Sequence, residues 1–343
     1  MLKYLLRRLL YMALTLLAVS VVTFVVIKLP PGDVLTNMIA EREAVGQASN
    51  REYIEGLRKT YGLDDPTYVQ YVRWMGLKWF VTFNKADTGL LQGDLGRSFE
   101  HNKPVTELMA ERLPLTMFLF VASVLLVYAL AVPIGIYSAT NKYSSWDYVF
   151  MGVTFVGMSI PGFLLALVLM FVLFKWYGIN PGGVFSPQFV GAPWSMARLA
   201  DFLKHLIAPL TVVAINGTAG LIRVMRANLL DQLRQLYVTT ARAKGLAEWR
   251  LLVKYPVRVA IIPVVSSLGF LLPGLIGGQA IMAIVLGLPT FGPLLLKALQ
   301  SQDMYLAGSV VMVQTLLVVV GVFLSDMLLV VVDPRIRLTG GTR

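Results

Sequence analysis

The sequence contains no cysteine among its 343 residues and only two histidines, His101 and His205. The absence of cysteine excludes disulfide bonds, thiolate metal ligands and a cysteine nucleophile. The two histidines are far apart in the chain and have no second ligand at metal-binding spacing, so a histidine metal site is not expected. We therefore predict no catalytic residue and no metal ligand in this chain.

Charged residues and phosphate-binding motifs are also scarce. Charged residues make up 14% of the chain and apolar residues 57%, and the mean hydropathy is +0.69. This composition indicates an integral membrane protein. No Gly-x4-Gly-Lys-Ser/Thr loop occurs, so the chain is not expected to bind ATP by that route or to carry a cofactor of its own. The net charge of +11 lies beside the apolar runs, which favours lipid headgroups over nucleic acid as its partner.

Six apolar stretches are long enough to cross a bilayer, which predicts an all-α membrane protein with six transmembrane helices. The first run lacks a small-x-small cleavage motif, so we interpret it as an uncleaved span rather than a signal peptide. Pro161-Gly162 predicts a kink in the third span, which either serves packing or shapes a pathway. Pro209 and Asn216-Gly217 are expected to interrupt the fourth span. The spans are expected at residues 9–27, 113–139, 148–174, 206–222, 259–288 and 307–332.

One long polar segment, Val34–Arg112, separates the first two spans and is close to neutral. We predict a large external domain over residues 30–112, between an N-terminal tail with the first span (1–29) and a core of five spans (113–338), followed by a tail (339–343). The domain could contact a soluble binding protein or only brace the spans, and both roles stay open. External loops are expected at residues 175–204 and 289–306.

A basic island, Arg223–Arg258, lies between the fourth and fifth spans. Its apolar residues recur at helical spacing, from Leu229 through Leu233 and Leu236 to Thr240, which predicts a helix with one apolar face. That helix is expected to end at Gly245 in the left-handed conformation. A second helix is expected to begin near Glu248 and to be stopped by Pro256.

Positive charge predicts which side of the membrane holds the island. With six spans, the side of both termini and the island carries fifteen Lys or Arg residues, against four in the two short loops opposite. Positive residues accumulate on the cytoplasmic side, whereas long domains cross regardless of charge. We therefore expect the island and both termini in the cytoplasm.

The island also carries a motif. The ten residues Tyr237-Val238-Thr239-Thr240-Ala241-Arg242-Ala243-Lys244-Gly245-Leu246 resemble the cytoplasmic coupling loop of ABC-importer permeases, in the branch that serves dipeptides, oligopeptides and nickel. Other importer branches carry Glu-Ala-Ala six residues before the glycine, whereas Thr239 holds the first of those places here, so a salt bridge from that acid is not carried over. Further similarities, in the family's order, are Pro31-Gly32-Asp33, Tyr61–Pro66, Gly93–Phe99, Asp303-Met304-Tyr305 and Asp333–Leu338.

The resemblance implies a type I ABC importer permease fold and a pore-forming subunit in a bacterial or archaeal cytoplasmic membrane. It implies that the coupling-loop residues dock on separate ABC ATPase subunits, which bind ATP and Mg. The implied partners are two such ATPases, a second permease in a heterodimer, an extracytoplasmic substrate-binding protein and membrane lipids, with no nucleic acid. The substrate stays open among peptides, nickel chelates, opines and oligosaccharides.

Broken, Gly- or Pro-containing spans commonly carry transport routes, so we expect the pore at the fourth and fifth spans. The candidate residues are Asn216, Gly217, Gly274, Gly278 and Gln279. For the Gly274-x-x-x-Gly278 pair, helix packing is the first interpretation and a translocation path the second, and for Asn216 a helix partner is the commoner case and a substrate in a wet cavity the other. An ion-coupled secondary transporter or channel is the alternative function, but the span centres hold almost no acids or bases. A membrane enzyme is a third class, and no catalytic constellation supports it.

Overall fold

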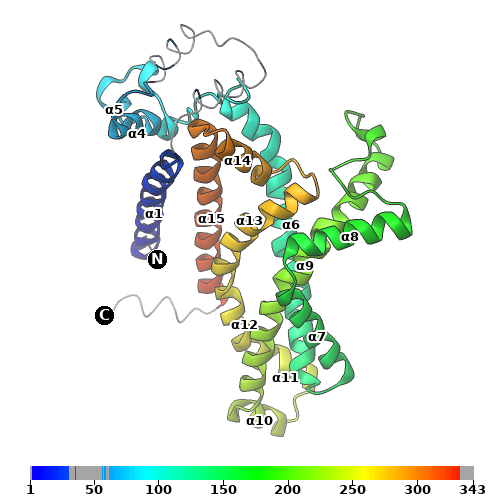
Figure 1. The fold of residues 1–343 in the computed structure, drawn as a ribbon. Coiled ribbons are helices and arrows are strands. Elements are labelled where there is room, and N and C mark those ends of the chain that lie inside the picture. The colour runs from blue at the N-terminus through cyan, green and yellow to red at the C-terminus, as the bar shows by residue number, and fades with distance from the viewer. Residues whose placement is uncertain (1, 31–34, 36–55, 57, 59–61, 333–343) are drawn as a thin grey trace. The chain divides into compact units, whose positions relative to one another are not determined.

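The computed structural model describes residues 2–30, 35, 56, 58 and 62–332, and most of these are helical (Figure 1). The Pro31-Gly32-Asp33 motif, Tyr61 and the Asp333–Leu338 motif lie outside the described residues. Within the described ranges, β-type pairing is limited to one antiparallel bridge between Arg97 and Pro104. The helices are α1 (Leu2–Lys28), α4 (Thr67–Met75), α5 (Trp79–Thr82), η1 (Lys85–Asp87), η2 (Leu90–Gln92), α6 (Val105–Thr140), α7 (Ser145–Ser159), α8 (Gly162–Tyr177), η3 (Pro187–Phe189), α9 (Met196–Leu233), α10 (Leu236–Ala243), α11 (Glu248–Lys254), α12 (Pro256–Ser266), α13 (Leu268–Val285), α14 (Phe291–Gln300) and α15 (Met304–Val332).

Four of these helices, α1, α6, α9 and α15, are by length and composition able to cross a membrane. Two bent pairs pass the same test together, α7 with α8 and the α11–α12 stretch with α13. Six spans result if each bent pair is one span. The helical membrane fold expected from the sequence is confirmed, and each expected span coincides with a long helix or a bent pair.

The third span differs from the single kinked helix that the sequence predicts. α7 ends at Ser159 and α8 begins at Gly162, and the two helices are bent by 110°. Proline disfavours the helical conformation in the residue before it, and Ile160 adopts an extended backbone with φ −98° and ψ 122°. The Pro161 position therefore ends one helix and begins another.

The fourth span is more continuous than the sequence predicts. α9 continues through Pro209 and Asn216-Gly217, where interruptions are expected, and it extends to Leu233. It also begins at Met196, inside the expected loop 175–204, where the Ser195 side chain accepts a hydrogen bond from the Arg198 N–H at 3.2 Å. Contacts with α7, α8, α12 and α13 surround α9, and such tertiary packing overrides weak local propensity.

The expected external turn at residues 289–306 is also partly wrong, because it contains the helix α14. Phe291, Leu294 and Ala298 are buried at the spacing of one helical face. Such amphipathic spacing favours a helix packed on the protein over a loop.

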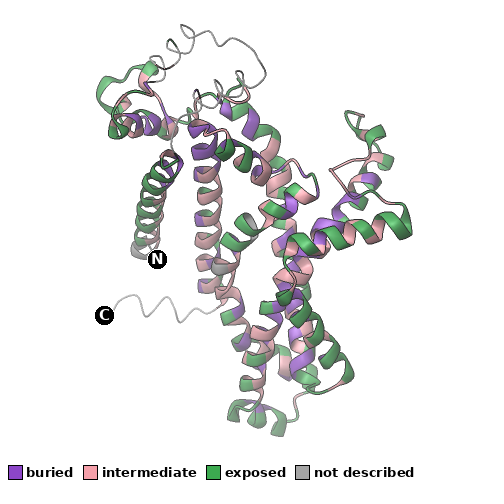
Figure 2. Cartoon of the chain, in the orientation of Figure 1, coloured by how far each residue is buried: buried purple, intermediate pink, exposed green. Residues whose placement is uncertain are grey.

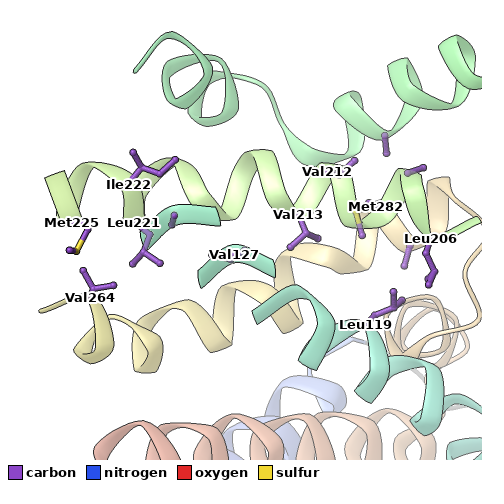
Figure 3. Packing of buried hydrophobic residues seen from close by; sticks show 14 of the residues in the cluster. Leu119, Val127, Leu206, Val212, Val213, Leu221, Ile222, Met225, Val264 and Met282 are labelled. Carbon is purple, nitrogen blue, oxygen red and sulfur yellow. The ribbon is translucent and has the colours of Figure 1, made fainter. Parts of the chain in front are cut away.

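The chain divides into two compact units. The first contains Leu115–Gly292 and the part of the chain from Val318. Its apolar core joins side chains of α6, α9, α12 and α13, among them Val127, Met225, Val264 and Met282 (Figure 3). Buried residues concentrate along α9 (Figure 2).

The second unit contains Leu5–Pro114 and Pro293–Leu317. In it the Gly93–Phe99 motif contacts the Asp303-Met304-Tyr305 motif, although about 200 residues separate them in the sequence. The Ser98 hydroxyl donates to Asp303 Oδ2 at 2.6 Å, and a Cβ on Gly96 would lie 2.4 Å from the Tyr305 ring. Asp303 has no exposed surface, and its other carboxylate oxygen accepts from the Leu306 N–H at 3.1 Å. The Gly93–Phe99 motif thus holds the beginning of α15.

Candidate functional site

The coupling-loop residues form a small helical knuckle, which we define as α10, the Gly245 turn and α11. α10 ends at Ala243, and Gly245 has φ 73°, so the predicted left-handed glycine is confirmed. α11 ends at Lys254, and Pro256 occupies the first turn of α12, as the predicted stop at Pro256 requires. Local sequence signals therefore define the second half of the knuckle correctly.

The first half of the knuckle differs from the prediction. One helix was expected to continue to Gly245 with Leu229, Leu233, Leu236 and Thr240 on one apolar face. The structure instead ends α9 at Leu233 and begins a new helix at Leu236. The break turns the face, so Leu229 is fully buried whereas Leu236 is 83% exposed.

A minimal core holds the knuckle together. Val238 and Ala241 of α10 are buried against Leu251 of α11, and Leu246 and Tyr255 pack at the edge of this cluster. Outside the cluster, the Arg242 guanidinium binds the Glu248 carboxylate through two hydrogen bonds, the longer at 3.2 Å. This pair is exposed and therefore contributes little to stability, because solvent screens it.

The other coupling-loop residues point outward. Thr239, Thr240, Arg242, Ala243, Lys244 and Gly245 are all exposed, and the Tyr237 hydroxyl donates to Gln232 Oε1 at 2.8 Å. Three large apolar side chains of the knuckle are also exposed, Leu236 at 83%, Trp249 at 66% and Val253 at 61%. Exposed apolar residues grouped with positive charge are typical of a protein interface rather than of a solvated loop.

The five candidate pore residues lie together. Asn216 and Gly217 of α9 and Gly274, Gly278 and Gln279 of α13 line one cavity of 270 Å³. Sequence reasoning missed the remaining lining residues, which are Gly162, Val212, Val213, Leu271 and Met282. Among the lining residues that the structure describes, none is charged. The glycine and proline content of the fifth span pointed to this region, and Gly162 belongs to the predicted kink for which shaping a pathway was one of two open roles.

Asn216 forms hydrogen bonds with neighbouring helices, which is one of the two roles that the sequence left open for it. With its amide oriented to match its neighbours, Nδ2 donates to the Gly157 carbonyl at 3.1 Å and Oδ1 accepts from the Gly162 N–H at 3.2 Å. These backbone groups belong to the two helices that meet at the 110° bend. Asn216 therefore satisfies backbone groups that the broken helix would otherwise leave unpaired.

The glycines have different roles. A Cβ on Gly217 would lie 2.7 Å from Val127, so this glycine allows α9 to approach α6 closely. A Cβ on Gly274 or Gly278 would meet nothing within 4 Å, so the predicted close helix approach at this pair is absent from the described structure. Both glycines are exposed and border the cavity. The Gln279 Nε2 atom is buried and has no hydrogen-bond partner in the described part of the chain.

One ion pair near the knuckle was not predicted. Arg226 of α9 binds Asp147 of α7 through two hydrogen bonds at 2.8 and 3.0 Å, and Asp147 also accepts from the Tyr143 N–H at 2.9 Å. The Asp147 side chain is only 3% exposed. The sequence shows both charges but separates them by 79 positions, and no local pattern indicates their pairing.

Comparison with known proteins identifies the family. Residues 131–338 match the family model described as the binding-protein-dependent transport system inner membrane component, and residues 1–120 match the model of its N-terminal region. The chain belongs to this family. The membrane component is 36% identical over 338 residues to the oligopeptide transport system permease protein AppB of Bacillus subtilis, covering 97% of this chain and 99% of that one. It is 28% identical over 338 residues to the oligopeptide transport system permease protein OppB of Haemophilus influenzae, covering 98% and 100%.

Family membership fixes the coarse function. The membrane component is a multi-pass inner membrane protein and the transmembrane subunit of a binding-protein-dependent transport system. It is a permease subunit within a larger transport complex and not itself the catalytic part. The alternative of an ion-coupled secondary transporter or channel is not favoured.

Proposed function

We propose that this chain is the pore-forming subunit of an ATP-driven peptide importer whose energy comes from separate ATPase subunits. The names of the two relatives, both oligopeptide permeases, support peptides as the substrate class. The sequence has no phosphate-binding loop, so ATP and Mg would be bound by two partner ATPases. A second, different permease and an extracytoplasmic binding protein would complete the complex, in a membrane with both termini and the knuckle on the cytoplasmic side.

The knuckle is the proposed contact with an ATPase subunit, and its exposed apolar face is the observation that carries this proposal. Leu236 is 83% exposed at the beginning of α10, beside the positive residues of the coupling loop. Exposed leucine is unfavourable in water and gains by burial in a groove. Val238, Ala241 and Leu251 would keep the knuckle folded while Leu236 and Trp249 enter the interface.

The cavity between α8, α9 and α13 is the proposed segment of the peptide path within this subunit. Its uncharged lining suits substrates whose shared feature is the peptide main chain rather than a particular side-chain charge. The unpartnered Gln279 Nε2 would donate a hydrogen bond to a peptide carbonyl. Asn216 would act indirectly, by holding the bend of α7 and α8.

Disulfide crosslinking tests the knuckle assignment, because the chain has no cysteine of its own. Leu236→Cys is expected to crosslink to a cysteine in the groove of the co-expressed ATPase, and Leu236→Glu is expected to abolish co-purification of the ATPase. Met196→Glu is the matched control, since Met196 is also 83% exposed but lies at the other end of α9. The proposal fails if Leu236→Glu assembles and transports like Met196→Glu.

A second experiment addresses the cavity separately. Gln279→Leu keeps a similar side-chain volume but removes the amide donor. In the assembled complex it should lower peptide transport while leaving ATPase co-purification unchanged, because the knuckle is untouched. Unchanged transport of several peptides would remove Gln279 from the path.

A further inference from the structure

A short segment of the second unit exposes an unusual amount of apolar surface. We define this apolar segment as Leu77–Lys85, which contains α5. Four of its large apolar side chains are exposed, Leu77 at 38%, Phe80 at 54%, Val81 at 82% and Phe83 at 71% (Figure 2). Isolated apolar residues are common on surfaces, but four within seven positions form a patch that requires a partner.

The apolar segment is built around a short helix. Phe80 and Val81 lie in α5, and Leu77 and Phe83 flank it on either side. The Trp79 ring lies 5.3 Å from the Phe80 ring and 5.4 Å from the Phe83 ring. These ring contacts join the aromatic side chains of the segment to one another.

The charges at the edge of the apolar segment are positive or compensated. Lys78 binds Asp87 at 3.0 Å, and the Thr82 hydroxyl donates to the same carboxylate at 2.7 Å. These contacts hold the pKa of Asp87 below its ordinary value, so its charge stays compensated at neutral pH. Lys85 adds an exposed positive charge at the end of the segment. Aromatic and aliphatic residues bordered by lysine are typical of a segment that lies at a membrane surface.

The position of α4 places the apolar segment near the end of a membrane helix. Within this unit the Tyr71 hydroxyl lies 2.8 Å from the Ser20 hydroxyl of α1, and the Trp74 ring lies 5.8 Å from the Phe24 ring. Ser20 is eight residues before Lys28, which is about 12 Å along the helix axis. α4 is therefore level with the last turns of the apolar α1, at the end opposite its N-terminus (Figure 1).

The contact of α4 with a second membrane helix, α15, places α4 at the same depth along the membrane normal. A Cβ on Gly308, in the second turn of α15, would lie 2.7 Å from the Trp74 ring. The apolar segment begins directly after Gly76, which ends α4. It therefore starts where two membrane helices reach the boundary between hydrocarbon and headgroups.

We propose that Leu77, Phe80, Val81 and Phe83 insert into the lipid leaflet at this end of α1 and anchor the external domain to the phospholipid surface. The occupant of the patch is the bilayer rather than another protein, because the patch directly follows α4, which packs on the last turns of the membrane helix α1. Lys78 and Lys85 remain at the headgroup level, where their charge meets lipid phosphates.

Site-directed spin labelling tests this anchor in the full-length chain, reconstituted in vesicles of phosphatidylcholine and phosphatidylglycerol. Because the chain has no cysteine, single nitroxide labels are placed by Phe80→Cys, Val81→Cys and Phe83→Cys without further changes. Val81 is 82% exposed, so its substitution removes little packing, whereas Phe80→Cys and Phe83→Cys also remove the ring contacts with Trp79. Lys103→Cys, before the beginning of α6, is the aqueous control, and Lys85→Cys is the control within the segment.

Collision with oxygen and with a neutral nickel chelate then reports the surroundings of each label. The three labels are expected to show an oxygen-to-nickel ratio about threefold or more above Lys103→Cys, because lipid concentrates oxygen and excludes the polar chelate. Lys85→Cys should remain near the aqueous control. Ratios equal to the control at all three positions would overturn the proposal. Low accessibility to both reagents would also overturn it, since that result means that a protein surface covers the patch.

Discussion

Gly245 offers the clearest test of how the knuckle is built, because its backbone conformation and its surroundings can be separated. Its φ of 73° is in the left-handed region, yet a Cβ at this position would meet nothing within 4 Å. A side chain therefore has room, and only the backbone conformation is unfavourable. For alanine the left-handed conformation costs about 1 kcal/mol, whereas asparagine tolerates it and a β-branched residue is penalised further.

These differences predict an order of stability for the knuckle rather than a single loss. Gly245→Asn should remain close to the native protein, Gly245→Ala should lose about 1 kcal/mol, and Gly245→Val should lose more. Hydrogen exchange of the amides of α10 and α11 measures this local opening. A loss of 1 kcal/mol corresponds to an approximately fivefold decrease in protection, because 1.4 kcal/mol is a factor of ten.

The control for this prediction lies in the same chain. Amides near Met225 in the core of α9 should keep their protection in all three variants, since the knuckle opens locally. If asparagine lowers protection as much as valine, then the absence of a side chain matters and the conformational argument is wrong. Equal protection in all four proteins would show that Gly245 does not limit the opening of the knuckle.

Two further predictions concern the contact between the external motif and α15. Gly96→Ala should destabilise the protein by about 1–3 kcal/mol more than Gly93→Ala, because both glycines have positive φ but only the Cβ on Gly96 would overlap the Tyr305 ring. Thermal loss of monodisperse protein in detergent measures the difference, and equal midpoints would contradict it. Burial raises the pKa of Asp303, and the hydrogen bond from Ser98 acts in the opposite direction. The protonated side chain is therefore favoured in the folded protein. The stability that this gives is present below the ordinary aspartate pKa and is lost as pH rises through the folded-state pKa. The stability of the native protein relative to Asp303→Asn should therefore fall as pH rises from about 4 to 8; a rise over that range would show that the hydrogen bonds outweigh burial.

Local signals explain which parts of the fold could be predicted. The apolar runs coincide with the four helices long enough to cross a membrane and with the two bent pairs, because their length matches the bilayer whatever the tertiary structure. Gly245 and Pro256 act on the backbone of their own residues, so the left-handed turn and the end of α11 follow from residue type alone. The left-handed turn at Gly245 and the stop at Pro256 were confirmed because each depends on the backbone of that residue alone.

The errors arise where a distant partner decides the backbone. Pro161 and Pro209 have the same local chemistry, yet the chain bends by 110° at the first and remains helical at the second. At Pro161 the Asn216 amide pairs with Gly157 and Gly162 on either side of the bend. At Pro209 the surrounding helices bury α9 and keep it continuous. Neither partner can be recognised from the sequence around the prolines.

The candidate sites show the same division. Tyr237 to Leu246 are contiguous, so a sequence motif could identify them together. The cavity joins α9 and α13 across about 60 positions and adds Gly162 of α8, which was expected in a kink that either serves packing or shapes a pathway. Residue composition pointed to the region, and only the bend at Pro161 brings α8 to it.

The continuity of α9 connects the two proposed sites. Gly217 borders the cavity and Leu233 ends the helix directly before the knuckle, which is 16 residues or about 24 Å of uninterrupted helix. Arg226 lies between them and is bound to Asp147, so α7 is tied to the same rod near the knuckle. Asn216 ties the other end of α7 and the beginning of α8 to it. A displacement of the knuckle by an ATPase would therefore move the α9 wall of the cavity and the bend together, because this one helix joins them, while α12 and α13 join the other end of the knuckle to the opposite wall.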